Sequence, residues 1–194
     1  MSLAHPLNSA LDRIAGRLGR YTPRQAEDQG RTWAAVALVL TPDPSSILLI
    51  RRAERAGDPW SGQVGLPGGR RHAGDADLLD TAIRETAEEV GLGLGRARHI
   101  GTLDDVVPRT PVLPPIAVRP FVFALDARPP LAPNHEVAEA HWVELAHLLE
   151  PGCRRDTTVT VRGQPLVVSA YVHGDLLVWG MTERILASFF QVIS

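Results

Sequence analysis

Apolar residues recur along this chain at two spacings, one typical of helices and the other typical of strands. The first helical pattern lies near the N-terminus, where four apolar residues stand three or four positions apart: Leu7, Leu11, Ile14 and Leu18. This spacing predicts a short amphipathic helix over residues 5–19, with Gly19 as its end. Residues 20–31 are polar and contain proline, so we expect residues 1–31 to be a helix followed by a lead-in.

Strand patterns dominate the middle of the chain. Apolar runs at residues 33–40 and 47–52 flank a turn rich in proline and serine, which is typical of a hairpin. Residues 52–69 are rich in glycine and charge, and we expect them to form an ordered loop. Helical spacing returns at residues 75–90, where Gly91 ends the run.

The C-terminal half continues as a mixture of strands and helices. We expect strands near 97–103, 112–125 and 137–143, a helical turn or two at 145–149, short strands within 157–179 around Gly163 and Gly174, and a closing helix over 181–192. Strands and helices do not alternate regularly. The order of elements therefore predicts an α+β fold, and the length of 194 residues suits a single domain spanning residues 1–194.

Composition narrows the function classes. The net charge of −2 offers no general attraction to nucleic acid or to an anionic bilayer, and no apolar run reaches the ~20 residues of a membrane span. All 20 basic residues are arginine, which excludes a Schiff-base lysine and favours bidentate contacts to phosphate, although nucleotide bias in the genome would give the same composition. A lone cysteine, Cys153, excludes an internal disulfide and suits a cytoplasmic protein.

Three glutamates on the predicted helix carry the clearest chemical signal. Glu85, Glu88 and Glu89 are spaced i, i+3 and i+4, so their carboxylates are expected to project from one side of the helix. Such like charges repel one another, and a hard cation such as Mg²⁺ or Mn²⁺ would neutralise them. The opposite face carries apolar residues that would anchor the helix on a core: Leu79, Ile83, Ala87 and Val90. Taken alone, such a cluster more often marks a solvated helix surface.

Residues 68–92 resemble the Nudix box, Gx5Ex7REUxEExGU, in which U is an aliphatic residue. The matching positions are Gly69, Arg84, Glu85, Glu88, Glu89, Gly91 and Leu92. Thr86 stands where an aliphatic residue is usual, and Asp75 stands where the first glutamate is expected. One extra residue separates Asp75 from Arg84, which the turn before the helix could absorb with Asp75 or Asp77 as N-cap. The resemblance implies a Nudix fold, with a mixed β-sheet sandwiched between helices.

The resemblance also implies roles for individual residues. Glu85, Glu88 and Glu89 resemble the metal ligands of the family, joined by the carbonyl oxygen of Gly68. Arg84 resembles the residue that orients these glutamates by ion pairing. Bound Mg²⁺ or Mn²⁺ would bridge phosphate oxygens and activate water, so the implied activity is metal-dependent hydrolysis of a phosphoanhydride bond.

A further acid is expected downstream of the box. Glu136 precedes a predicted strand that contains a tryptophan, at a place where many Nudix enzymes carry an additional acidic group. Glu136 is therefore the candidate for an extra metal ligand or for the general base. Asp104 and Asp105, which follow another predicted strand, are competing candidates, as are the glutamates of the box.

The segment before the box bears on the substrate. It resembles in part the signature LLTxR[SA]x3Rx3Gx3FPGG of coenzyme A pyrophosphatases, but the position of the second arginine falls on Gly57 or Asp58, and Arg55 is the nearest substitute. The residues expected to contact substrate are Arg52, Arg55, Trp60 and Gly69. Trp60 is as typical of packing as of stacking on a base.

The resemblance leaves several substrates open. The expected substrate is a small nucleotide, coenzyme A or acyl-CoA, cleaved to 3′,5′-ADP and 4′-phosphopantetheine. ADP-ribose, NADH and nucleoside triphosphates are alternatives. A non-catalytic nucleotide-binding module is an alternative of another class, and assembly into a homodimer is left open.

Overall fold

The computed structural model describes residues 9–42, 44–58, 60–109, 114–161 and 163–194. Leu7 and residues 112–113, which begin a predicted strand, lie outside the described residues. The elements are α1 (Ser9–Leu18), β1 (Thr32–Thr41), β2 (Ser46–Arg52), β3 (Val64–Gly65), β4 (Gly68–Arg70), α2 (Leu78–Val90), the 3-10 helix η1 (Leu94–Arg96), β5 (Arg98–Thr102), β6 (Ile116–Ala124), β7 (Val137–Glu144), α3 (Leu145–Leu148), β8 (Arg154–Val161), β9 (Gln164–His173), β10 (Leu176–Trp179) and α4 (Met181–Ile193).

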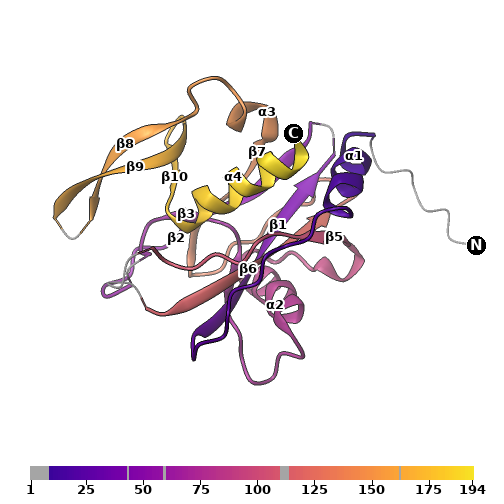
Figure 1. Ribbon diagram of the computed structural model, residues 1–194, viewed down its shortest axis with the longest axis horizontal. Helices are drawn as coiled ribbons and strands as arrows, with labels where there is room; N and C mark the ends of the chain where they lie inside the picture. The colour runs from indigo at the N-terminus through magenta and orange to yellow at the C-terminus, as the bar shows by residue number, and fades with distance from the viewer. Residues whose placement is uncertain (1–8, 43, 59, 110–113, 162) are drawn as a thin grey trace, which may run out of the picture.

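A seven-stranded mixed sheet forms the centre of the described chain (Figure 1). β1 runs parallel to β6 along nearly its whole length and antiparallel to β2, which confirms the predicted hairpin. β1 and β2 pair only beside their turn, at Leu40 with Ile47 and at Thr41 with Ser46, and then separate. β3 and β4 fill the gap, because β3 pairs with β2 and β4 pairs with β1.

The expectation of a loop over residues 52–69 is wrong for its last part. The carbonyl of Pro67 accepts a hydrogen bond from the amide of Ala37 at 2.8 Å, and the carbonyl of Gln63 accepts one from the amide of Arg52 at 3.0 Å. The segment is thus hydrogen-bonded to both flanking strands. Strands of two and three residues carry no readable hydrophobic period, and therefore the sequence pattern did not show them.

Side chains along β1 alternate between the two faces of the sheet, and helices cover both faces. Ala35, Ala37 and Val39 join a buried cluster with residues of α2, whereas Leu38 and Leu40 join another with residues of α1 and α4. Figure 1 shows α2 on one side of the sheet and α1 and α4 on the other. A mixed sheet sandwiched between helices confirms the predicted α+β fold class.

α1 confirms the predicted amphipathic helix. Leu11, Ile14 and Leu18 are buried, and the helix contacts α4 and β5. At Gly101 of β5 an added Cβ would lie 2.8 Å from the Cβ of Leu18, so the glycine allows this close approach. The apolar face of α1 is therefore used within the chain. No helix in the described ranges is long and apolar enough to cross a membrane.

α2 has defined ends. The side chain of Asp77 accepts a hydrogen bond from the amide of Asp80 at 2.9 Å, so Asp77 is the N-cap rather than Asp75. Gly91 ends the helix in the left-handed conformation, with φ 67°, and its amide donates to the carbonyl of Ala87. The extra residue of the box is thus accommodated in the turn that precedes the cap.

The buried face of α2 differs from the predicted one. The prediction placed Ala87 on the anchoring face, but Ala87 is exposed, and Leu79 and Ile83 are only partly buried. The buried positions are Thr81, Ala82, Thr86, Glu89 and Val90. Thr86 can be buried because its hydroxyl donates to the carbonyl of Ala82 at 2.7 Å. The helix is consequently rotated so that one glutamate points toward the sheet.

A second, three-stranded sheet of β8, β9 and β10 projects at the upper left of Figure 1. Its two turns contain Gly163 and Gly174, which have φ values of 75° and 58°. These are the two turns that the sequence predicted. β10 leads directly into α4 through Gly180, so the position of the closing helix depends on this sheet.

Candidate active site

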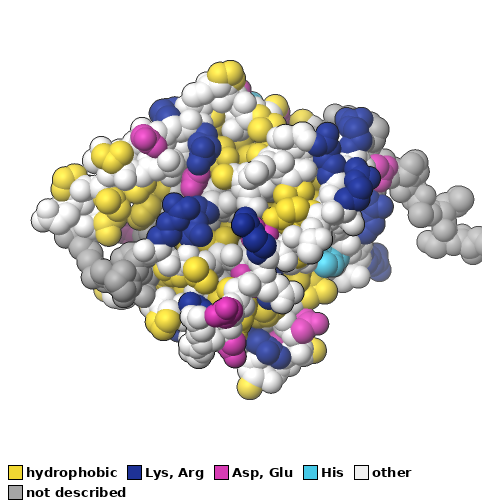
Figure 2. Space-filling model, viewed as in Figure 1, with side chains coloured by type: hydrophobic (Ala, Val, Ile, Leu, Met, Phe, Trp, Pro, Cys, Tyr) yellow, Lys and Arg dark blue, Asp and Glu magenta, His cyan; other side chains and the backbone are white. Residues whose placement is uncertain are grey.

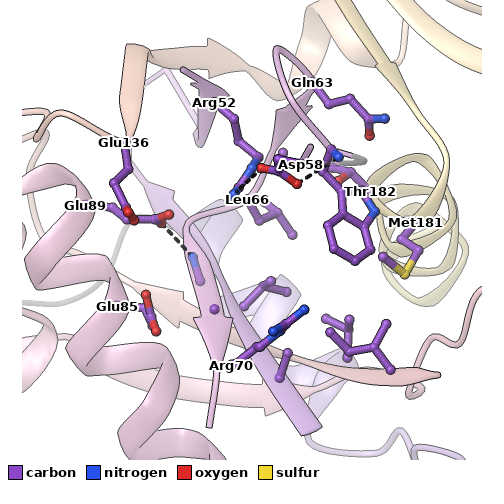
Figure 3. Close-up of a pocket in the computed structure, with 18 of the residues that line it drawn as sticks. Arg52, Asp58, Gln63, Leu66, Arg70, Glu85, Glu89, Glu136, Met181 and Thr182 are labelled. Atoms are coloured by element: carbon purple, nitrogen blue, oxygen red, sulfur yellow. Dashed lines mark hydrogen bonds and ion pairs between the residues drawn. The ribbon is translucent and has the colours of Figure 1, made fainter. Parts of the chain in front are cut away.

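A cavity of about 570 Å³ lies where α2, β3, β4, the start of β7 and the start of α4 meet (Figure 3). Four carboxylates line it, those of Glu85 and Glu89 from α2, that of Glu136 from the residue before β7, and that of Asp58. We call it the carboxylate cavity. The described residues thus bring together three of the predicted acids from two distant segments.

Glu89 is the most buried of these acids, with an exposure of 2 %. Its carboxylate accepts a hydrogen bond from the amide of Gly68 at 2.8 Å, drawn as a dashed line in Figure 3. Burial raises the pKa of Glu89 to about 7, and the negative charges of Glu85 and Glu136 add to the effect. A carboxylate in this position favours a nearby positive charge.

Gly68 and Gly69 lie in β4, between β1 and the glutamates of α2. Pro67 and Arg71 exchange hydrogen bonds with β1, so in the antiparallel pattern the amide and the carbonyl of Gly68 both face away from β1. An added Cβ at Gly69 would overlap the carboxyl group of Glu85, and one at Gly68 would overlap the backbone of β1. Only glycine therefore lets the strand pass beneath the glutamates.

Arg84 connects Glu85 and Glu88. Its Nη1 lies 2.9 Å from Glu85 Oε1 and 3.0 Å from Glu88 Oε2. The side chain of Glu88 is 54 % exposed and does not line the carboxylate cavity. The box glutamates therefore differ in their surroundings: Glu89 points inward, whereas Glu88 lies outside the cavity with Arg84.

Asp75, at the position where the box has its first glutamate, holds the other edge of Arg84. Its two oxygens accept from Nε and Nη2 of Arg84 at 2.8 and 3.0 Å, and it also accepts from the amide of His72 and the hydroxyl of Thr81. The bond from Arg84 and that from the amide of His72 hold the pKa of Asp75 well below its usual range. The arginine is thus fixed on both sides.

Three arginines line the carboxylate cavity, Arg52, Arg55 and Arg70, and an acid pairs with each of the first two. Arg55 lies 3.1 Å from Glu136, and Arg52 lies 2.9 Å from Asp58. The Nε of Arg52 is buried and has no hydrogen-bond partner within the described residues. Burial alone would raise the pKa of Asp58. The hydrogen bonds from the amide of Trp60 and from Arg52 outweigh this effect and lower that pKa. The site therefore contains one N–H group, Nε of Arg52, that makes no hydrogen bond within the described residues.

The remaining predicted site residues separate into two groups. Trp60 lines the carboxylate cavity and also packs against the main core, so both interpretations of this residue find support. Asp104 and Asp105 do not line this cavity. They are bound elsewhere, Asp104 by Arg24 and Tyr21 and Asp105 by Arg119. As general bases they are therefore disfavoured relative to Glu136.

Sequence reasoning missed several residues of the site. Asp58 was noted only as the place of a missing arginine, and its contact with Arg52 had no signal in the sequence. Met181 and Thr182 at the start of α4 also line the cavity, more than one hundred positions after β3, which lines it too (Figure 3). Only the fold brings α4 to this place.

The oxygen-rich donor set of the cavity suits a hard divalent cation such as Mg²⁺ or Mn²⁺. Within the described ranges, no three acidic, histidine or cysteine side chains already stand close enough together to enclose a metal ion. Guanidinium groups hold the acids instead, Arg84 with Glu85 and Arg55 with Glu136. Burial, together with the charges of Glu85 and Glu136, raises the pKa of Glu89, and a bound cation would favour its charged form. The residues therefore fit a cation that would exchange places with these contacts.

Comparison with known proteins agrees with the fold and the motif. Residues 31–161 match the NUDIX domain family. The chain is 32 % identical over 172 residues to the mitochondrial coenzyme A diphosphatase NUDT8 of Mus musculus, covering 87 % of this chain and 80 % of that protein. It is 41 % identical over 113 residues to an uncharacterised protein of Schizosaccharomyces pombe, covering 56 % of this chain and 34 % of that much longer protein.

A solved structure shows the same fold. The MutT/nudix family protein from Enterococcus faecalis superposes with a TM-score of 0.58 at 19 % sequence identity, covering 96 % of this chain and 70 % of that chain. The family match spans well over half of the chain and includes the glycines of β4 and the glutamates of α2. This protein therefore belongs to the Nudix family of pyrophosphohydrolases.

Proposed function

We propose that this protein hydrolyses a pyrophosphate bond in a nucleoside diphosphate linked to another group, with Mg²⁺ or Mn²⁺ as cofactor, and that coenzyme A or acyl-CoA is the substrate. The products would be 3′,5′-ADP and 4′-phosphopantetheine. One observation carries the proposal: Glu85, Glu89 and Glu136 face one cavity that Arg52 and Arg55 also line. Acids for a cation and arginines for phosphate thus meet in one place.

The acids of α2 have distinct parts in this proposal. Glu85 and Glu89 would hold the cation, with the Gly68 carbonyl and, after a change of rotamer, Glu88 as further ligands. When bound, the cation would neutralise phosphate oxygens and lower the pKa of water. Arg84 positions Glu85 and Glu88 from outside the cavity, and Asp75 keeps Arg84 in place.

Glu136 is proposed to take the proton from the attacking water. Its carboxylate faces the carboxylate cavity, and among the described residues it pairs only with the side chains of Arg55 and, at 4.0 Å, His135. Both partners are mostly exposed, so they can move away when a polyanion binds. Arg55 released in this way would be free to contact a substrate phosphate.

Coenzyme A is favoured by the similarity to a coenzyme A diphosphatase and by the partial signature before the box. Asp58 favours a second candidate. It occupies one of the two places where that signature has an arginine and neutralises Arg52. A cavity with less positive charge suits a nucleoside diphosphate without a third phosphate, such as ADP-ribose or NADH.

A hydrolysis panel tests the proposal. Purified protein is supplied with Mg²⁺ or Mn²⁺ and with coenzyme A, acyl-CoA, ADP-ribose, NADH or a nucleoside triphosphate, and products are resolved by chromatography. We expect the highest kcat/KM for coenzyme A or acyl-CoA and no turnover with EDTA. Comparable rates on all substrates would overturn a dedicated coenzyme A enzyme. No turnover of any pyrophosphate with metal would overturn the hydrolase itself.

A further inference from the structure

A second cavity, of about 770 Å³, lies on another side of α4. Five segments line it: the polar lead-in near Arg24, the stretch from Asp104 to Arg109, β8, β9 and α4. Figure 2 shows basic side chains gathered over the left part of α4, on the face seen in Figure 1. None of the proposed catalytic residues lines this second cavity.

The three acids that line this second cavity, Asp104, Asp105 and Glu183, are each paired with an arginine. The Arg24–Asp104, Arg119–Asp105 and Arg154–Glu183 pairs each have a shortest distance of 2.8 Å. These pairs fix the walls, since they join the lead-in to the stretch after β5, that stretch to β6, and β8 to α4. The acids lining the cavity are thereby already matched.

Two further arginines have no such match. Arg184 donates from Nη1 to the carbonyl of Val107 at 2.6 Å, and neither Arg184 nor Arg109 forms an ion pair with an acid in the described part of the chain. Burial and the nearby charge of Arg109 hold the pKa of Arg184 below its usual value. Two guanidinium groups thus face one cavity and repel each other.

Neighbouring donors point to the same kind of ligand. Tyr171 also lines the cavity, and its hydroxyl is a further possible donor. An oxyanion would accept from this hydroxyl and from both guanidinium groups. Guanidinium groups match the tetrahedral oxygens of phosphate with paired hydrogen bonds, which a single carboxylate fills less completely.

We propose that this arginine cavity, defined by Arg109, Arg184 and Tyr171, is a binding site for the phosphate group of a small molecule. It shares two walls with the carboxylate cavity. Met181 and Thr182 of α4 face one cavity and Arg184 faces the other, and Val118, which lines the first, bridges to Val106, which lines the second. At these two places, residues that line one cavity are direct neighbours of residues that line the other.

Titration calorimetry with inorganic phosphate tests this site. EDTA is present throughout, so that no metal retains phosphate in the carboxylate cavity. We expect saturable binding by the natural protein and affinity at least about tenfold weaker in Arg184→Gln and in Arg109→Gln, since each loses a charge-assisted pair. Arg98→Gln is the matched control, because Arg98 is an exposed arginine paired with Asp12 on α1.

Arg109→Gln decides the question, because the side chain is exposed and its loss leaves the packing intact. Unchanged affinity in this variant, or no saturable binding by the natural protein, overturns the proposal. Adenosine monophosphate in place of phosphate distinguishes the source: tighter binding than phosphate indicates a nucleotide, and equal binding indicates free phosphate. Citrate binding as tightly as phosphate would overturn the assignment to phosphate.

Discussion

The carboxylate cavity and the arginine cavity share α4 as a wall and carry opposite excess charge. In the first, Glu89 is buried near two other acids, and its pKa is raised. In the second, Arg184 is partly buried near another arginine, and its pKa is lowered. Each cavity therefore keeps like charges close together, although these charges repel each other. Among the described residues, neither Glu89 nor Arg184 has an ion-pair partner, and a charge of this kind favours a ligand of opposite sign.

The largest effect on activity is expected at Glu89, the buried acid of the carboxylate cavity. Glu89→Gln keeps the size of the side chain and an acceptor for the amide of Gly68. We expect kcat to fall by about 100-fold or more, because the charge that holds the cation is lost. Steady-state kinetics with a metal titration measures this, and circular dichroism checks that the fold is retained.

Glu88→Gln is the control for that variant, since Glu88 is more than half exposed and lies with Arg84. We expect a clearly smaller loss. Equal losses in the two variants would contradict the division of roles between Glu89 and Glu88. Phosphate binding in the arginine cavity should be the same in both variants and in the natural protein, which separates the two cavities experimentally.

Gly69→Ala should have the second largest effect. The added Cβ overlaps the carboxyl group of Glu85, so Glu85 must leave its position over β4. We expect the affinity for Mn²⁺ to fall by about 10- to 100-fold, as for other changes beside a metal ligand. Gly74→Ala is the control, since no atom lies within 4 Å of its added Cβ. Unaltered Mn²⁺ affinity in Gly69→Ala would remove Glu85 from the metal site.

Asp58→Asn makes the carboxylate cavity more positive, because it removes the acid that pairs with Arg52. Arg52 loses its acid partner and becomes available to substrate phosphate. We expect KM for coenzyme A to fall by about 2- to 5-fold, which corresponds to roughly 0.5–1 kcal/mol. Asp175→Asn, which removes an 86 % exposed partner of Arg51, should leave KM unchanged. A higher KM in Asp58→Asn would show that Asp58 helps to bind substrate.

The smallest expected effect is on acid stability. The folded-state pKa of Asp75 lies below its unfolded value, so its stabilising effect is complete above the unfolded pKa, about 4, and is lost as the pH falls toward the folded pKa. Asp75→Asn should therefore lower Tm at pH 7, and the difference from the natural protein should shrink below pH 4. A Tm difference that does not depend on pH would exclude this ion pair as its cause.

The sequence predicted the parts of the site that are local. Helical spacing located Glu85 and Glu89 on one helix, and the resemblance to the box indicated Gly68 and Gly69 before it. The burial of Glu89 and the exposure of Glu88 were not predictable, because adjacent positions of a helix differ in burial only through the surface against which the helix packs. Asp75 was expected as a possible cap, but its partner Arg84 is found only in the fold.

The arginine cavity had no local signal at all. Arg109, Tyr171 and Arg184 come from three separate segments, and arginines occur throughout the sequence. No periodicity relates such residues. The overall fold class was predictable because burial alternates along the strands and recurs along the helices, whereas a site built from distant segments depends on how those elements pack.

The gap between β1 and β2, which β3 and β4 fill, has a consequence for motion. The backbone beneath Glu85 and Glu89 is β4, a strand of the central sheet, so it can open only when the sheet itself opens. The amide proton of Gly69, which faces β1, should exchange with solvent as slowly as those of the protein interior. The stretch around Arg55 and the start of α4 would then adapt to substrates of different shape, while β4 beneath the reacting phosphate stays rigid.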